Sequence, residues 1–266
     1  MGESIVITSG KGGVGKSTTS ANLGVSLALL GKKVCMIDAD IGLRNLDVLV
    51  GLENRIIYDL VDVAEKRCTV EKALIKDKRC RELYLLPAAQ TKDKTAISAN
   101  QLRGIVAELK EKFDYILIDC PAGIEVGFKN AVKSADKAII VTTPENAAIR
   151  DADRVVGLLE KYDISSPKLV VNKLRMHMSK VGNLLDVDEV VSVLSIDLLG
   201  VVPDSEEVLS AGHLGEPVVF NTNSLAGKAF RHIARRIQGE VVPLLVLRKE
   251  NSFVKGCKRL LGIGSK

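Results

Sequence analysis

Aromatic residues are scarce in this 266-residue chain, at 3% of the sequence, and tryptophan is absent. A large core must therefore be aliphatic, and 46% of the sequence is hydrophobic. Buried parallel strands covered by helices have a core of this kind. The length suits one large domain, or at most two small ones.

Cysteines and histidines are also few and scattered. The five cysteines are odd in number and form no CxxC pair. This spacing excludes a disulfide framework and a zinc knuckle, and it predicts a reducing compartment. No basic and then apolar leader opens the chain, and no run of eighteen apolar residues occurs. We therefore expect neither a secretory signal nor a membrane span.

The body of the chain lacks net charge. Residues 248–266 hold six basic residues and one acidic residue, which accounts for the whole net charge of +5. The rest of the sequence has 32 basic and 32 acidic residues. Nucleic acid is therefore not an expected partner of the body, because such binding needs clustered basic residues.

Short apolar runs alternate with helix-length segments almost throughout. This order predicts an α/β fold with a mostly parallel sheet flanked by helices on both faces. We expect one domain over residues 1–247, followed over 248–266 by a tether and an amphipathic helix. The predicted strands are Ser4–Thr8, Val34–Asp38, Leu83–Pro87, Tyr115–Asp119, Lys137–Thr142, Lys168–Val171 and Leu198–Val202. The predicted helices include Ser17–Leu30, Asn100–Lys112, Ala147–Lys161, Val187–Leu194 and Ser224–Gly239.

A glycine-rich segment joins the first predicted strand to the first predicted helix. It reads Gly10-Lys11-Gly12-Gly13-Val14-Gly15-Lys16-Ser17-Thr18 and fits the GxxxxGK[ST] pattern of a P-loop. Backbone N–H groups of such a loop, with the helix N-terminus, cradle phosphates. We expect Lys16 to reach the β- and γ-phosphates and the Ser17 hydroxyl to coordinate Mg²⁺. The predicted fold is therefore that of a P-loop NTPase.

Aspartates end two other predicted strands. Tyr115–Asp119 is a Walker B-like strand whose terminal carboxylate, Asp119, can hold the Mg²⁺ shell. Val34–Asp38 runs into Ala39 and Asp40 in the same way. Carboxylates beside a P-loop predict phosphoryl transfer to water, which depends on positioning and charge neutralisation.

The expected base-binding residues also lie at strand ends. The Asn172 carboxamide can donate to and accept from an adenine edge, and Pro203 and Asp204 end the next strand. A guanine-binding NKxD motif is incomplete here, because Arg175 stands where its aspartate would be. ATP is therefore favoured over GTP.

The C-terminal tail has an amphipathic pattern. On a helix, its apolar residues form one stripe and its basic residues flank that stripe. Such a pattern is typical of a helix at an anionic membrane surface. A helix docked on the body, or a frayed basic terminus, is the alternative. The residues concerned are Phe253, Val254, Lys255, Cys257, Lys258, Arg259, Leu260 and Leu261.

Together these motifs resemble the MinD/ParA family of deviant Walker A P-loop ATPases, and in particular its septum site-determining branch, over the whole chain. The resemblance is carried by KGGVGKST, DADIGLRNLD, QTKDK, PAGIE and IRDADR, which occupy Lys11–Thr18, Asp38–Asp47, Gln90–Lys94, Pro121–Glu125 and Ile149–Arg154. The family implies ATP and Mg²⁺ as cofactors, and slow hydrolysis that depends on dimerisation.

The resemblance also implies roles for single residues. In the family the first P-loop lysine, here Lys11, reaches across a two-fold interface to the partner's nucleotide and acts in hydrolysis with Lys16. The resemblance implies that Asp38 supports magnesium and that Asp40 orients the attacking water. Asn45 is expected in the interface of the homodimer.

The implied partners come from bacterial cell division. By resemblance, Asp151, Asp153 and Arg154 form a helix face that recruits the division inhibitor MinC, although these residues equally suit a solvated face. The protein would pass between the cytoplasm and the inner face of the cell membrane. There it would present MinC, which blocks FtsZ ring assembly, and a topological regulator, MinE or a static polar system, would set the pattern.

Four other functions stay open at this point. A flagellar-number ATPase carries a similar tail, and a DNA-segregation ATPase shares the phosphate site. An iron–sulfur reductase needs cysteines on two facing loops, and only Cys120 is suitably placed. A scaffold that does not hydrolyse ATP requires a mispositioned Asp40.

Overall fold

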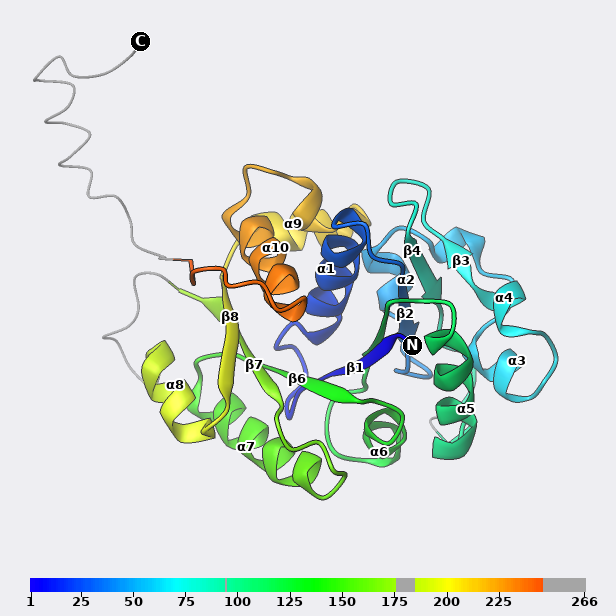
Figure 1. The fold of residues 1–266 in the computed structure, drawn as a ribbon, viewed down its shortest axis with the longest axis horizontal. Helices are drawn as coiled ribbons and strands as arrows, with labels where there is room; N and C mark the ends of the chain where they lie inside the picture. The colour runs from blue at the N-terminus through cyan, green and yellow to red at the C-terminus, as the bar shows by residue number, and fades with distance from the viewer. Residues whose placement is uncertain (94, 176–184, 246–266) are drawn as a thin grey trace, which may run out of the picture.

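The structure is a computed structural model that describes residues 1–93, 95–175 and 185–245 (Figure 1). Its strands form an eight-stranded sheet in the order β3-β4-β2-β5-β1-β6-β7-β8. Every pairing is parallel except that of β3 with β4. The strands are β1 (Glu3–Thr8), β2 (Val34–Asp38), β3 (Ile75–Lys76), β4 (Leu83–Leu86), β5 (Tyr115–Asp119), β6 (Lys137–Thr142), β7 (Lys168–Leu174) and β8 (Asp197–Pro203).

Helices cover both faces of the sheet, so the predicted fold class is confirmed (Figure 1). The helices are α1 (Lys16–Leu29), α2 (Leu46–Leu49), α3 (Leu60–Ala64), α4 (Val70–Ala73), α5 (Ala99–Lys110), α6 (Val126–Val132), α7 (Asn146–Glu160), α8 (Val187–Leu194), α9 (Glu206–His213) and α10 (Leu225–Ile237), with 3₁₀ turns η1 (Glu53–Arg55) and η2 (Val218–Phe220). The sequence did not predict β3, α2, α3, α4, α6 or α9, most of which are very short.

Alternating side chains of each central strand enter two separate cores. In β1, Ile5 and Ile7 pack on the face covered by α1 and α10, whereas Val6 packs on the face covered by α5 and α7. Both faces of β1 are therefore dry, as expected for the middle of a parallel sheet. This burial fixes where β1 ends, and so it fixes where the P-loop begins.

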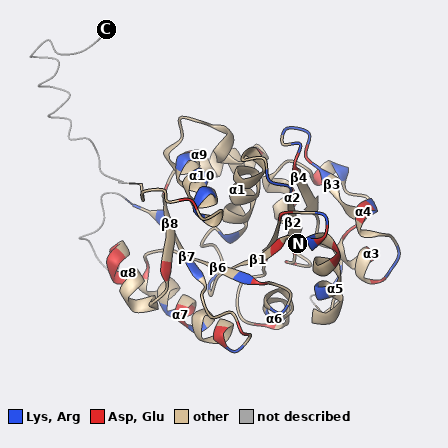
Figure 2. Cartoon of the chain, viewed as in Figure 1, with Lys and Arg blue, Asp and Glu red and all other residues tan. Residues whose placement is uncertain are grey.

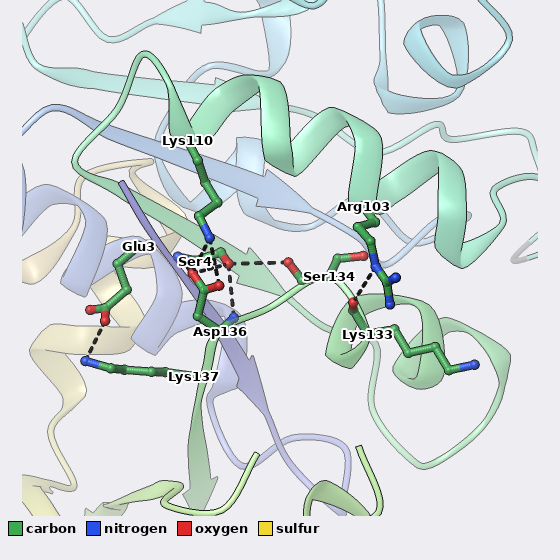
Figure 3. A network of polar contacts seen from close by, with 8 residues as sticks. All are labelled: Glu3, Ser4, Arg103, Lys110, Lys133, Ser134, Asp136 and Lys137. Carbon is green, nitrogen blue, oxygen red and sulfur yellow. Dashed lines mark hydrogen bonds and ion pairs between the residues drawn. The ribbon is translucent and has the colours of Figure 1, made fainter. Parts of the chain in front are cut away.

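Polar side chains close the sheet at the end opposite the P-loop (Figure 3). The Asp136 carboxylate accepts hydrogen bonds from the backbone N–H and hydroxyl of Ser4, each at 2.8 Å, and from Lys110 Nζ at 2.7 Å. Beside it, Lys137 pairs with Glu3. These contacts join the starts of β1 and β6 to the end of α5, so this network holds the sheet and lies away from the phosphate site.

None of the helices in the described part of the chain is both long and apolar enough to cross a bilayer.

Candidate nucleotide site

A cleft of about 610 Å³ opens at the carboxyl ends of the strands, which is where ligands bind in open α/β sheets. The structure brings together there most of the residues that the sequence predicted for the nucleotide. Those lining the cleft are Lys11, Gly12, Gly13, Gly15, Lys16, Ser17, Thr18, Asp40, Asn45, Asn172, Pro203 and Asp204.

Two glycines let the P-loop pass close to its neighbours. A Cβ on Gly10 would lie 2.2 Å from the backbone of Asp151 in α7. Gly15 has a φ of +93°, and a Cβ there would lie 2.2 Å from Asn172 Nδ2. Gly15 is also the N-cap of α1, so a turn that glycine adopts without strain aims the N-terminus of α1 into the cleft.

Lys16 and Asp119 form the buried polar centre. The Lys16 ammonium lies 3.7 Å from the Asp119 carboxylate, and their side chains are 8% and 1% exposed. Ser20, one turn along α1, donates to the same carboxylate oxygen at 2.8 Å. No sequence pattern indicates the role of this serine, because that role depends on β5 lying beside α1.

Asp38 lies next to Asp119, because the two are register partners at the ends of β2 and β5. Its carboxylate accepts the backbone N–H groups of Asp40 at 3.0 Å and of Asn45 and Leu46 at 3.2 Å. Burial, and then the charge of Asp119, raise the pKa of Asp38 to about 7. Asp38 therefore shapes the loop that carries Asp40 and Asn45, and its link to magnesium stays a prediction.

The oxygen donors at the P-loop fit Mg²⁺. Asp119 Oδ2 is buried and has no hydrogen-bond donor among the described residues. The Ser17 hydroxyl and the buried Asp40 line the same cleft. Carboxylate and hydroxyl oxygens beside phosphates are what Mg²⁺ prefers.

The two P-loop lysines have different surroundings. Lys16 is buried, whereas the Lys11 side chain is 45% exposed and its Nζ lies 3.8 Å from a Glu145 carboxylate oxygen. Glu145 is the N-cap residue of α7. The Ser9 hydroxyl donates to the Lys11 carbonyl at 3.0 Å and so fixes the loop beneath it. The first lysine thus points along the surface of its own subunit.

The expected base-binding residues line the cleft at the ends of β7 and β8, and Asn172 contacts the P-loop directly. β7 continues past Asn172 to Leu174, and Asn172 Nδ2 donates to the Val14 carbonyl at 2.8 Å. Lys173 Nζ donates to the Gly13 carbonyl at 2.7 Å. Asp204 accepts from Arg175 Nε at 2.9 Å. These contacts tie β7 and β8 to the P-loop, and the reading of adenine stays a prediction.

Sequence reasoning missed an apolar wall of this cleft. It is built by α2 and α9, two short helices that the alternation of strands and long helices did not reveal. Its residues are Leu43, Val48, Leu49, Val208, Leu209, Gly212 and His213. Asn45 is exposed at the rim between this wall and the P-loop.

The expected partner-binding residues lie on α7. Asp153 and Arg154 are exposed, and Arg154 lies 3.6 Å from the half-buried Asp151. Because Gly10 packs on the backbone of Asp151, this surface adjoins the P-loop directly.

Some predictions fall outside the described residues, namely Lys94 and the whole tail from Phe253 to Leu261. Where the structure is described, no group of three or more His, Cys, Asp or Glu residues could hold a metal ion. Cys120 is buried behind the P-loop, and burial raises the pKa of its thiol to about 12.

The family model, the related sequences and the similar solved structures all indicate the same protein family. The family model of ParA, described as NUBPL iron-transfer P-loop NTPase, matches residues 1–238. The septum site-determining protein MinD of Bacillus subtilis is 63% identical over 268 residues, which covers 100% of both chains.

Two solved structures resemble the chain closely. One is a MinC:MinD cell division protein complex of Aquifex aeolicus, with a TM-score of 0.86, 50% identity, and coverage of 92% of this chain and 99% of that one. The other is the septum site-determining protein MinD of Pyrococcus horikoshii complexed with Mg-ADP. Its TM-score is 0.81 at 30% identity, and the match covers 89% of this chain and 96% of that one.

Proposed function

Because the chain belongs to the MinD family of septum site-determining P-loop ATPases, we propose that ATP converts it from a free monomer into a membrane-bound dimer that recruits MinC. It is an ATPase that positions the division site, and its cofactors are ATP and Mg²⁺. The proposal concerns how the residues of this chain link the nucleotide to the membrane.

One observation carries the proposal: the two P-loop lysines have separate surroundings. Lys16 is buried beside Asp119, where it can hold the phosphates of its own subunit. Lys11 is half exposed and pairs only loosely with Glu145, at 3.8 Å between exposed groups. Such a surface pair contributes little stability, so Lys11 is available to a second subunit's nucleotide.

The chemistry is transfer of the γ-phosphoryl group of ATP to water, which depends on positioning and charge neutralisation. A water oxygen bonds to the γ-phosphorus and gives up a proton to the phosphate oxygens or to solvent, the bond from that phosphorus to the bridging oxygen breaks, and ADP and inorganic phosphate leave. Asp40 orients the water, while Lys16 and the partner's Lys11 stabilise the charge on the phosphates. Mg²⁺ bound by Ser17 and the carboxylates would neutralise part of that charge. We therefore expect hydrolysis to be slow in the monomer, because its own phosphates lack the charge of the partner's Lys11.

The tail supplies the membrane contact. We assign residues 1–247 to the ATPase domain and 248–266 to a tether and an amphipathic helix, from its sequence pattern of apolar and basic residues. One such tail binds marginally, whereas two on one dimer gain avidity on the order of 10²–10⁴. Dimerisation on ATP would therefore lead to membrane binding. The proposed location of the dimer is the inner face of the cell membrane.

The proposed MinC surface is the exposed part of α7 around Asp153 and Arg154. The close approach of Gly10 to Asp151 supports a link between this surface and the nucleotide. We expect Asp153→Ala and Arg154→Ala each to weaken MinC binding to vesicle-bound protein, while Glu160→Ala, exposed at the end of the same helix, leaves it unchanged. Equal MinC binding by all three would place its site elsewhere.

The test of the whole proposal is sedimentation with anionic liposomes in ATP and in ADP. We expect strong sedimentation of the wild type with ATP, and loss of it both in Lys16→Ala and in a chain truncated after Ser252. Lys72→Ala removes an exposed lysine of α4 and should behave as the wild type does. Asp40→Ala should bind ATP without hydrolysing it and stay on the liposomes longer.

Other outcomes lead to different functions. Sedimentation that is equal in ATP and ADP would make the tail a constitutive anchor. Absence of sedimentation, together with binding to DNA, would favour a segregation ATPase. The flagellar-number ATPase, the other alternative, has less support because the full-length relatives are septum site-determining proteins.

A further inference from the structure

Helix α10 carries a cluster of positive charges, although residues 1–247 as a whole have no net charge. The helix carries Lys228, Arg231, Arg235 and Arg236 and no acidic residue, whereas residues 1–247 have equal numbers of basic and acidic residues. Figure 2 shows Lys and Arg, without Asp or Glu, along this helix. The charges are not used in the nucleotide site, since α10 lies away from the P-loop on the outer side of α1.

A hollow of about 480 Å³ lies between α10 and the end of α1. Its Lys and Arg lining residues are Lys228, Arg231 and Arg235, and its apolar ones are Leu29 and Leu30, which are 51% and 41% exposed; Ser26, Thr222 and His232 complete the lining. No acidic residue lines it. We call the five Lys, Arg and Leu residues the α1–α10 face.

Most of the charge on this face is not neutralised within the chain. Arg231 donates to the carbonyls of Val219 at 2.7 Å and Thr222 at 3.1 Å, which leaves its charge without a carboxylate. Lys228 is exposed and makes no ion pair among the described residues. Only Arg235 pairs with an acid, Glu240, at 2.7 Å. The face therefore presents about two uncompensated positive charges next to two exposed leucines.

Cations beside exposed aliphatic side chains suit the boundary of an anionic bilayer, where phosphates and acyl chains meet. A nucleic acid would use the cations and leave the leucines in water. The tail itself is an unsuitable occupant, because it carries positive charge as the face does.

The path of the segment that precedes the tail also favours an anionic bilayer as the partner of this face. Arg236, on the same helix, donates to the carbonyls of Val242 at 2.8 Å and Pro243 at 2.7 Å. The last described stretch of the chain, up to residue 245, therefore runs beside α10. A tail inserted in a membrane would bring α10 close to the headgroups.

We propose that the α1–α10 face is a second membrane contact, which binds the headgroups of anionic phospholipids once the tail has brought the protein to the bilayer. The proposal rests on the proposed membrane function and adds to it a part of the folded body. It also implies an orientation, with α10 and the end of α1 toward the lipid.

The experiment measures binding of the full-length protein, with ATP, to phosphatidylcholine vesicles containing 0–30% phosphatidylglycerol. Lys228→Glu changes one exposed cation to an anion, and Lys72→Glu on α4 makes the same charge change at the β3 edge of the sheet. Each basic residue near an anionic surface is worth about fivefold in affinity. We expect Lys228→Glu to bind at least tenfold more weakly than Lys72→Glu on anionic vesicles and equally on pure phosphatidylcholine.

Two further variants make the result specific. Leu29→Ser with Leu30→Ser should weaken vesicle binding at every lipid composition, because these leucines contribute apolar contact. ATP-dependent dimerisation, measured by light scattering, should be unchanged in Lys228→Glu, which shows that the subunit is folded and the switch intact.

The two possible failures are distinct. Equal vesicle binding by Lys228→Glu and Lys72→Glu, with strong binding by the wild type, would overturn the α1–α10 contact alone. Absence of ATP-dependent binding by the wild type would overturn the membrane function and this contact with it. A loss of duplex DNA binding in Lys228→Glu, without loss of vesicle binding, would overturn it in favour of a nucleic-acid surface.

Discussion

Gly10 is the residue at which the P-loop touches α7. A methyl group there would lie 2.2 Å from the Asp151 backbone, which cannot move without shifting the helix. We expect Gly10→Ala to cost about 1–3 kcal/mol through this overpacking and to weaken ATP binding by about tenfold. Titration with a fluorescent ATP analogue measures the affinity, and urea unfolding measures the stability.

Gly157 on the same helix provides the control. It is exposed, and nothing lies within 4 Å of the position of its Cβ. Because alanine forms helix more readily than glycine, Gly157→Ala should raise the free energy of unfolding by about 0.5–1 kcal/mol. Unchanged ATP affinity in Gly10→Ala would show that the P-loop is independent of α7.

Asp38 should make the nucleotide-free protein sensitive to pH. Burial and the charge of Asp119 raise the pKa of Asp38 from 3.8 to about 7, so the folded state holds this proton more tightly than the unfolded state does. The stabilisation from that proton is complete below about pH 4 and is lost as the pH rises through 7.

The measurement is the melting temperature of the nucleotide-free protein from pH 5 to pH 8. Wild-type stability should fall relative to that of Asp38→Asn by at most about 1.4 kcal/mol per pH unit, because asparagine cannot titrate. The difference should level off above pH 7. Parallel curves for the two proteins would mean that Asp38 is ionised throughout this range.

At the scale of elements, Arg79 joins the two short helices that wall the cleft. Its guanidinium donates to the carbonyl of Gly215, after α9, at 2.9 Å, to that of Val50, after α2, and to Asp77. It also lies over the ring of Phe220, with its Cζ 5.4 Å from the centroid. One side chain thus sets the distance between α2 and α9.

We expect Arg79→Ala to destabilise the fold by about 2–3 kcal/mol, because the charged hydrogen bonds are lost and the carbonyls that accepted them are left without this donor. Nucleotide release should also be faster, since the wall loosens. Urea unfolding and stopped-flow release of a fluorescent ADP measure the two effects. Arg79→Lys should recover only part of the lost stability, because a lysine ammonium lacks the planar fork of donors that lets arginine bond both carbonyls.

Arg81, exposed two residues further on, is the matched control. Arg81→Ala should change neither stability nor release. If Arg79→Ala were as stable as the wild type and released ADP at the same rate, α2 and α9 would keep their positions without the hydrogen bonds of Arg79.

The elements that the sequence predicted are those whose pattern is contained in their own residues. β1, β2 and β5 each contain a run of three or four apolar residues that is buried, and the P-loop has its own motif. Their carboxyl ends meet at one edge, so the neighbourhood of Asp38 and Asp119 could be predicted as well.

The missed elements depend on contacts from elsewhere in the chain. β3 has two residues and exists because β4 pairs with it. α2 has four residues and begins where the Asp38 carboxylate accepts the N–H groups of Asn45 and Leu46. The Ser20 bond to Asp119 and the Gly10 contact with α7 likewise require the folded sheet. No local period of hydrophobicity could reveal them.

At the scale of the whole molecule, charge separates the two tasks of the chain. The body, whose charges balance, carries the nucleotide site, and the proposed switch assigns the membrane contact to a basic tail of 19 residues from 248 to 266. In the proposed switch the tail itself does not respond to ATP. ATP instead changes the number of tails in one assembly, from one in the monomer to two in the dimer. Lys11 determines that number through dimerisation, so the switch should fail without Lys11 and should return when a second tail is supplied by other means.

This consequence can be tested in one chain. Lys11→Ala should bind ATP, stay monomeric and sediment weakly with anionic vesicles. Joining a second copy of residues 248–266 to its C-terminus through a flexible linker should restore sedimentation by about 100-fold, equally in ATP and ADP. As a control, a second copy carrying Leu260→Glu and Leu261→Glu should restore none, because its apolar stripe is broken. If monomeric Lys11→Ala sedimented as well as the wild type, one tail would suffice, and ATP would have to act on the membrane contact by a route other than dimerisation.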